Sequence, residues 1–170
     1  KCISCECDLL KSGIPYIIEK ALKPYKGYTS YSTIFEYAIC MPCANNMKSL
    51  ISAHSMENIT QYFTQNFDPE NTRRNLSTND NIEVENWLSQ CIIKDTSITD
   101  LGECQIYGQC KGDQMLLGHF PYMVGGVALD EMIDLLSAET LDDLNRFKNE
   151  IVDGPSEFQD LLQSGPKVFL

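Results

Sequence analysis

The sequence predicts an α+β protein in which a small cysteine-bearing module precedes a mostly helical remainder with a small β-hairpin. Three observations lead to this fold class. Two Cys-x-x-Cys pairs flank two strand-like runs near the amino terminus, apolar residues then recur at helical spacing, and a Lys-Gly-Asp turn separates two short apolar runs further on. We expect an amino-terminal module over residues 1–54, a helical connector over 55–91 and an α+β region over 92–170.

Two strands and a helix are predicted in the first module. Residues 14–18 are Ile-Pro-Tyr-Ile-Ile and residues 33–39 are Thr-Ile-Phe-Glu-Tyr-Ala-Ile, and both runs are rich in the β-branched and aromatic residues that favour strands. Residues 23–32 contain a Pro and a Gly and predict the loop between them. Pro42 suits the first turn of a helix, which is expected over 44–51 because its apolar residues share one face.

Two further helices are predicted in the connector. Ser55 suits the N-cap of the first, whose apolar side chains recur at helical spacing. This stripe consists of Ile59, Tyr62, Phe63 and Phe67. The same spacing indicates a second helix that bears Val84, Trp87, Leu88 and Cys91. The polar residues 75–81 between them are predicted to be a linker.

The last region combines a hairpin with helices. Residues 111–113 form the Lys-Gly-Asp turn of the hairpin. The Gly pair at 125–126 precedes an amphipathic helix, and the Ser-Ala-Glu-Thr segment at 137–140 can cap the next one. A short helix after 154–156 and a final strand over 168–170 complete the expected order.

Cysteine spacing is the strongest chemical signal in the chain. Cys2 and Cys5 form one pair, and Cys40 and Cys43 form another after thirty-four intervening residues. Two such pairs can surround one Zn²⁺ with four thiolates at about 2.3 Å and leave no open position, which is typical of a structural site. We therefore predict one structural Zn²⁺ bound by Cys2, Cys5, Cys40 and Cys43. A disulfide framework and a redox dithiol are the alternatives for these pairs.

The predicted order of elements favours a treble clef over a zinc ribbon. A cysteine pair comes first, then two strands, then a second pair whose last cysteine lies in the first turn of a helix. The free N–H groups and partial positive charge of a helix N-terminus stabilise the thiolate of Cys43. In a zinc ribbon the second pair would instead lie in a hairpin, with no helix after it.

Charge and composition narrow the classes of function. The net charge of −11 disfavours nucleic-acid binding, which needs a basic face, although the first 50 residues carry six Lys against four acidic residues. No apolar run reaches the roughly 18 residues that suggest a membrane span. The eight cysteines in paired spacing suit a reducing compartment, so we expect a cytoplasmic protein without membrane contact.

Four other cysteines and two histidines are weaker candidates. Cys7 can replace a ligand of the predicted site, but we favour a neighbouring, non-ligating thiol. A second metal would need the ligands Cys91, Cys104, Cys110 and His119, whose spacing contains no Cys-x-x-Cys pair. Buried cysteine is also common as a small apolar filler. His54 is expected to be a surface or capping residue.

Two charged groups are expected to be solvated surface. Lys20, Lys23 and Lys26 form a thin basic patch on the first module. The acidic side chains of the last helices can bind a basic partner, but they more often form the polar face of amphipathic helices. They include Asp130, Glu131, Asp134, Asp142 and Asp143.

Three stretches resemble an uncharacterised bacterial zinc-binding protein family with paired Cys-x-x-Cys motifs, of treble-clef or zinc-ribbon type. They are residues 35–43 (Phe-Glu-Tyr-Ala-Ile-Cys-Met-Pro-Cys), 105–110 (Gln-Ile-Tyr-Gly-Gln-Cys) and 120–123 (Phe-Pro-Tyr-Met). The resemblance implies a bacterial, non-secreted protein with a single zinc. It implies no activity and no catalytic residue.

The function that the sequence predicts is non-enzymatic protein interaction or scaffolding. The expected contact face is a hydrophobic or acidic surface of the last helices, and the expected partner is a protein. The alternative is an enzyme or a nucleic-acid-directed protein that uses the zinc module for docking. Lysines clustered beside the cysteine pairs would favour nucleic acid, and a cleft that joins a histidine to carboxylates would favour catalysis.

Overall fold

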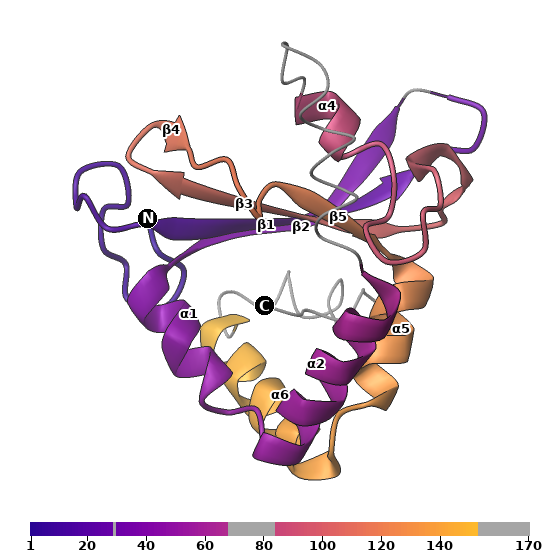
Figure 1. Cartoon of the computed structure of the whole chain (residues 1–170). Coiled ribbons are helices and arrows are strands. Elements are labelled where there is room, and N and C mark those ends of the chain that lie inside the picture. Colours follow the sequence, from indigo (N-terminus) through magenta and orange to yellow (C-terminus); the bar gives the residue numbers. More distant parts are fainter. Residues whose placement is uncertain (29, 68–83, 153–170) are drawn as a thin grey trace.

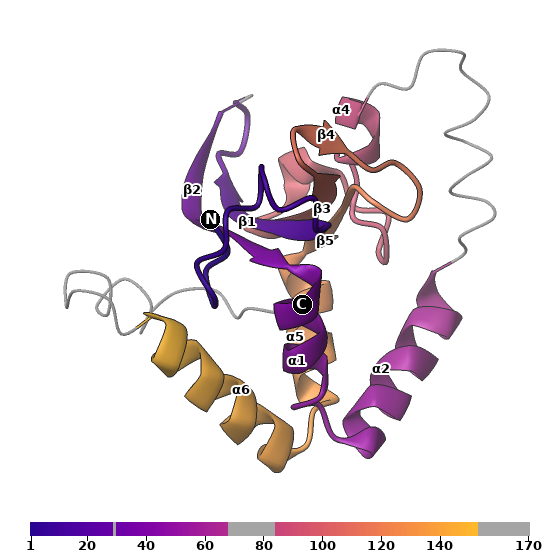
Figure 2. The same ribbon diagram turned by 90° about the vertical axis from the view of Figure 1, so that its left-hand side faces the viewer.

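The computed structural model describes residues 1–28, 30–67 and 84–152 and shows an α+β fold, as predicted. Its strands are β1 (Tyr16–Pro24), β2 (Tyr31–Cys40), β3 (Cys104–Lys111), β4 (Gln114–Met115) and β5 (Tyr122–Gly125). Its helices are α1 (Met41–Lys48), α2 (Ala53–Asn66), α4 (Val84–Trp87), α5 (Gly126–Asp134) and α6 (Ala138–Val152). Both ribbon views show α1, α2, α5 and α6 on the same side of the sheet (Figures 1 and 2).

The sheet is antiparallel throughout, and β1 lies between β2 and β3. β3 pairs on its other side with β4 near Cys110 and with β5 near Cys104. Strands from the predicted regions 1–54 and 92–170 therefore share one sheet. The later region contributes more strand than the small hairpin that the sequence suggested.

Most of the predicted elements are confirmed. Both strands of the first module are present, and they extend into the predicted loop 23–32, which is reduced to a turn at the hairpin tip. There the amide of Tyr28 donates to the carbonyl of Tyr25 at 3.0 Å, and Gly27 has a φ of +83°. A type II turn requires positive φ at its third residue, so glycine is favoured at this position.

Three details differ from the prediction, and some predicted elements are not tested. The N-cap of α2 is Ser52, whose hydroxyl accepts from the amide of Ser55, so Ser55 lies inside the helix. α4 ends before Cys91, and β5 was not predicted because its four residues are too few for a periodic pattern. The predicted linker 75–81, and the helix and strand expected after residue 153, lie outside the described residues.

The core is built where helices cover the sheet. One cluster joins Ile17 and Ile39 of the sheet to Ala44 and Met47 of α1. Side chains alternate between the two faces of a strand, so Ile17 marks the face of β1 that the helices cover. The other cluster includes Leu22 near the far end of β1 and packs α5 onto β3 and β5. Its fully buried members include Cys104, Met123, Val124 and Ala128.

Four hydroxyl groups join the N-termini of α2 and α6. The amide of Ser52 donates to Thr140 Oγ1, and the amide of Ser137 donates to Ser55 Oγ, both at 2.9 Å. Ser137 Oγ accepts from the amide of Thr140 at 3.2 Å and thereby caps α6. Ser55 and Thr140 are fully buried, so these bonds replace water at two helix starts.

The substitution Thr140→Val should destabilise the protein by about 1–3 kcal/mol, because it leaves the partly buried amide of Ser52 without its acceptor and removes the fully buried Thr140 hydroxyl from the cluster. The measurement is urea denaturation. Thr60→Val is the matched control, because Thr60 is exposed on α2 and its hydroxyl bonds only to the carbonyl of Met56. Equal losses in the two variants would contradict a structural role for the hydroxyl cluster.

A buried acidic residue lies in the middle of the sheet. Glu19 is fully buried, and its neighbours across the strands are Tyr37 and Tyr107, with Tyr122 one strand further. Tyr37 donates to Glu19 Oε2 at 2.5 Å, while Oε1 has no hydrogen-bond partner among the described residues. Burial raises the pKa of Glu19 to about 8, and the hydrogen bond from Tyr37 opposes that shift only in part. Glu19 is therefore mostly protonated at neutral pH.

The stability of the protein should fall as pH rises from about 4.5, the pKa of an unfolded Glu, to about 8. In this window the unfolded chain releases a proton that the folded chain retains, with a slope of up to about 1.4 kcal/mol per pH unit for one group. Urea denaturation at pH 5, 7 and 9 measures the slope. Glu19→Gln, which is neutral at every pH, should remove this contribution. If the free energy of unfolding falls equally with pH in both proteins, Glu19 is not the source of the pH dependence.

Candidate metal centre

Five cysteines gather at the end of the sheet where β1 begins. Cys40 ends β2 and lies opposite Tyr16, the first residue of β1. The amino-terminal segment folds against the outer side of β2, where the amide of Ile3 donates to the carbonyl of Ala38 at 2.8 Å. The amino terminus therefore lies at this end of the sheet, next to α1 (Figure 1).

A tight loop brings the first three cysteines together. The amide of Cys2 donates to the carbonyl of Cys7, and the amide of Glu6 donates to the carbonyl of Cys2, both at 2.9 Å. Glu6 has a φ of +59°, in the left-handed region that reverses a chain sharply. The loop closes on itself, so Cys7 returns to the side of Cys2.

The sulfur atoms have the spacing of a metal site. The Sγ atoms of Cys2, Cys5, Cys7 and Cys40 all lie within 4.8 Å of one another, a group that can hold a metal ion. Cys5 Sγ and Cys40 Sγ are 3.8 Å apart. Four thiolates at about 2.3 Å from a tetrahedral Zn²⁺ would be about 3.8 Å from each other. This pair therefore already has the separation of two zinc ligands.

Cys43 lies at the border of this group, in the first turn of α1. Its thiol is half-buried, and its residue follows Cys40 by three positions. α1 begins directly after β2, with Cys40 as its N-cap and Pro42 in its first turn. The short spacing of Cys40 and Cys43 thus places both thiols near the helix start. A helix therefore follows the two strands and carries the last cysteine of the second pair.

The thiols differ in how readily they become thiolates. Burial raises the pKa of Cys2, but backbone N–H groups that donate to its sulfur, above all that of Cys40 at 3.4 Å, lower it to about 6. The backbone N–H of Cys7 lowers the pKa of Cys5. The Cys5 thiol raises the pKa of Cys7 to about 12, and burial with its thiol neighbours raises that of Cys43 to about 12. A bound cation would relieve the repulsion between neighbouring thiolates. The backbone N–H groups would stabilise the negative charge of the ligand sulfurs.

The sequence identified four of these five cysteines as ligands and treated Cys7 as a neighbour. The structure places Cys2, Cys5 and Cys40 together, and it brings Cys7 into the same group of sulfurs. The available signal was the Cys-x-x-Cys-x-Cys spacing at residues 2–7. That spacing predicts proximity along the chain, but only the folded loop shows that Cys7 points back toward the other sulfurs.

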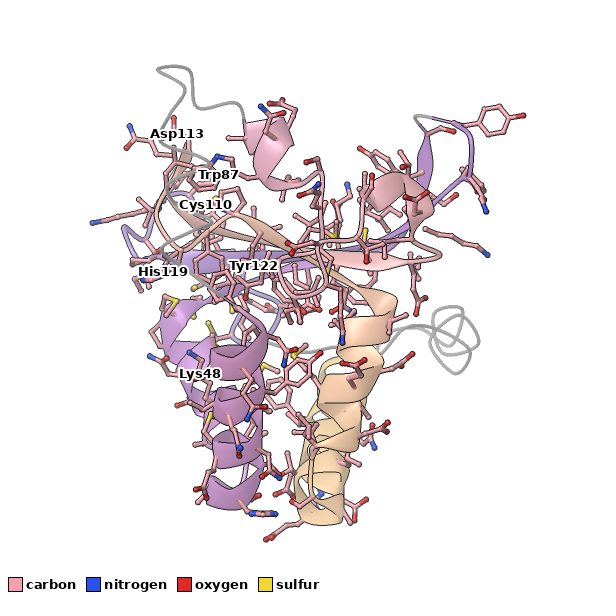
Figure 3. The ribbon with its side chains drawn as sticks, turned by 45° about the vertical axis from the view of Figure 1, so that its right-hand side comes forward. Lys48, Trp87, Cys110, Asp113, His119 and Tyr122 are labelled. Atoms are coloured by element: carbon pink, nitrogen blue, oxygen red, sulfur yellow. The ribbon has the colours of Figure 1, made fainter. Side chains whose placement is uncertain are left out.

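The second candidate metal site is not assembled. Cys104 and Cys110 lie at opposite ends of β3, about 20 Å apart at 3.3 Å per residue. Cys110 packs in the same core cluster as Cys2 and Cys40, whereas Cys91 and Cys104 belong to the cluster around α5. Figure 3 shows Cys110 near Asp113, at the end of β3 where the β3–β4 turn begins. Among the described residues, only the amino-terminal group has the spacing of metal ligands.

Neither histidine lines the cleft beside the start of α5. His54 is exposed on α2, 3.4 Å from the amide nitrogen of Asn58, and His119 is exposed between β4 and β5. The cleft has a volume of about 510 Å³. Its charged side chains are Lys94, Asp100, Glu103 and Asp130.

Comparison with protein-family models, with curated proteins and with solved structures finds no match for the chain. The bacterial zinc-binding family that three stretches resemble therefore gains no support from these comparisons. The part of that resemblance which the structure does show is the cysteine group. No helix among the described residues combines the length and the apolar character that crossing a membrane requires.

Removing metal from the full chain should loosen the amino-terminal segment and leave the far end of the sheet unchanged. Bound metal adds its binding free energy to the folded state. Hydrogen exchange of individual amides, with and without a strong chelator, measures the effect. Protection of the amides of Ile3 and Cys40 should fall, while that of Met123 in β5 should stay the same. Uniform loss along the sheet would contradict a local role for the metal.

Proposed function

We propose that this chain is a non-enzymatic metal-binding protein in which one structural Zn²⁺ fastens the amino-terminal segment to β2 and α1. The observation that supports it is the group of four sulfur atoms within 4.8 Å of one another, drawn from residues 2–7 and from Cys40. Thiolate ligands select soft or borderline ions, of which Zn²⁺ is the usual occupant of a four-sulfur site. All eight cysteines are free thiols, which suits the reducing cytoplasm that the sequence predicts.

The chemistry of the group favours a structural metal. A catalytic zinc keeps one position for water or substrate, whereas four thiolates fill the tetrahedron. The ligands come from the amino-terminal loop and the end of the β1–β2 hairpin, with Cys43 of α1 next to them. A metal that joins three segments stabilises a local fold too small to persist on hydrogen bonds alone. The order of two strands, a cysteine pair and a helix supports our inference of a treble clef.

The hairpin tip is the surface we propose for contact with a partner. Tyr25, Tyr28 and Tyr31 are 45%, 72% and 54% exposed. The chain has no acidic residue between Lys20 and Phe35, so the tip is basic in a protein of net charge −11. Exposed tyrosines with few competing charges are typical of protein interfaces. This surface replaces the last helices as the favoured contact face.

Because the tip is basic, we propose that its partner is a protein with an acidic surface. Lys20 is paired with Glu36 at 2.8 Å, while Lys23 and Lys26 form no ion pair within the described part of the chain. These lysines lie at the opposite end of the hairpin from the cysteines, so they do not form a basic patch beside the metal. Two free lysines are fewer than the phosphate contacts on which nucleic-acid affinity usually depends.

A photo-crosslinking amino acid in place of Tyr28 tests this function in the native cell. The same amino acid in place of Val127, which is 65% exposed on α5, is the matched control. Tyr28 should crosslink to one protein that Val127 does not capture. Calorimetry with that purified partner should then show binding that weakens with added salt and falls about tenfold or more in Tyr28→Ala, as expected for an interface hot spot.

Two outcomes would contradict the proposal. Crosslinks from Tyr28 to nucleic acid would support the rival function. Binding of the purified partner that is unchanged in Tyr28→Ala would show that the tip is not the contact surface. Neither outcome depends on the metal, whose presence is measured separately by elemental analysis of protein purified without added metal.

A further inference from the structure

The metal centre contains one thiol more than a tetrahedral ion can bind. The two Cys-x-x-Cys pairs and the group of four sulfurs within 4.8 Å share three cysteines, which are Cys2, Cys5 and Cys40. The fourth position then has two candidates, Cys7 and Cys43. The inference drawn from this surplus rests on the proposed function, because it concerns the same metal.

The three shared cysteines form a fixed part of the site. Cys2 and Cys40 are 1% and 2% exposed, and the amide of Cys40 donates to Cys2 Sγ at 3.4 Å. Cys5 Sγ is 3.8 Å from Cys40 Sγ, the separation of two ligands on one zinc. Because strand pairing places Cys40 and a closed loop places Cys2, these positions do not depend on which thiol is the fourth ligand.

Cys7 and Cys43 approach this part of the site from two different elements. Cys7 comes from the amino-terminal loop, where its carbonyl accepts the amide of Cys2. Cys43 comes from the first turn of α1, three residues after Cys40, whose Sγ belongs to the four-sulfur group. Both thiols are half-buried, and Cys5 is exposed. The variable side of the centre therefore faces solvent, whereas Cys2 and Cys40 lie on the protein side.

We propose that Cys7 and Cys43 are alternative fourth ligands of one Zn²⁺ held by Cys2, Cys5 and Cys40. In the exchange between them, the zinc–sulfur bond to one thiol forms as the bond to the other breaks. The proton of the entering thiol passes, through solvent, to the departing thiolate. The net charge of the centre is unchanged, and no oxidant is needed. Such a centre releases its metal more slowly than a four-cysteine site, because an internal thiol replaces a ligand that leaves before the ion escapes.

Cobalt binding to the full chain tests the ligand assignment, because Co²⁺ in a four-thiolate site has intense absorption bands that report the number of sulfur ligands. Cys7→Ser and Cys43→Ser should each bind one Co²⁺ with an affinity close to that of the unsubstituted chain. The double variant should lose the four-thiolate spectrum and bind at least about tenfold more weakly, since even an outer-shell partner of a metal is worth that much. Cys110→Ser, a thiol of the same core cluster, is the matched control and should change nothing.

The rate of zinc transfer to a chromogenic chelator tests the exchange itself. The unsubstituted chain should release Zn²⁺ more slowly than either single variant, because only that chain has a fifth thiol that can take the position of a ligand that leaves. Equal release rates in all three proteins would overturn the exchange mechanism.

Other results distinguish this proposal from the one on which it rests. If only Cys43→Ser weakens cobalt binding, the ligands are the two Cys-x-x-Cys pairs and Cys7 is a bystander. If only Cys7→Ser weakens it, Cys43 is the bystander. Either result overturns the alternative-ligand proposal while the structural metal stands. Failure of the unsubstituted chain to bind Co²⁺ or Zn²⁺ would overturn both.

Discussion

The pairing of β1 with two other strands is the interaction on which the rest of the structure depends. β1 bonds to β2 over its whole length and to β3 from Tyr16 to Leu22, so it joins the first 40 residues to a strand that begins at residue 104. Its Tyr16 end brings Cys40 and Cys110 to the same end of the sheet. Its middle holds Glu19 between two tyrosines. Any change that shifted this register would move the cysteines and bury a different set of side chains.

The helices are attached to this sheet in two different ways. α1 and α5 pack apolar residues onto it, and both follow a strand almost directly. α2 packs the partly buried Tyr62 and Phe63 against the core around α5, but its only fully buried residue is Ser55, which bonds to the start of α6. Hydrogen bonds between capping hydroxyls are directional, so they fix how two helix starts meet. Burial of apolar area alone specifies such geometry less sharply.

A metal bound at the cysteine group would compensate for the weak attachment of the amino-terminal segment. The first seven residues contribute one backbone hydrogen bond to β2 and a loop closed on itself. That loop adds little apolar surface to the core beyond Cys2 and, at its edge, Cys7. A cation that binds thiolates from this loop and from Cys40 adds a strong contact where hydrophobic burial is small. Because the loop buries so little surface, three of the five thiols are accessible to solvent. This accessibility is the basis for expecting ligand exchange.

Much of the local structure and part of the site were determined by the sequence alone. Strand propensity, helical spacing and turn residues act over a few neighbours, so β1, β2, α1, α5 and the β3–β4 hairpin could be predicted. The two Cys-x-x-Cys pairs likewise indicated the metal centre. Only the tertiary structure decided that β1 pairs with β3, that Cys104 and Cys110 lie far apart and that Cys7 joins the sulfur group. The physical reason is that alternation along a strand determines which face a side chain takes, but not which distant strand lies beside it. Burial of Glu19 follows from the same non-local pairing, because its neighbours Tyr37 and Tyr107 are distant in the sequence.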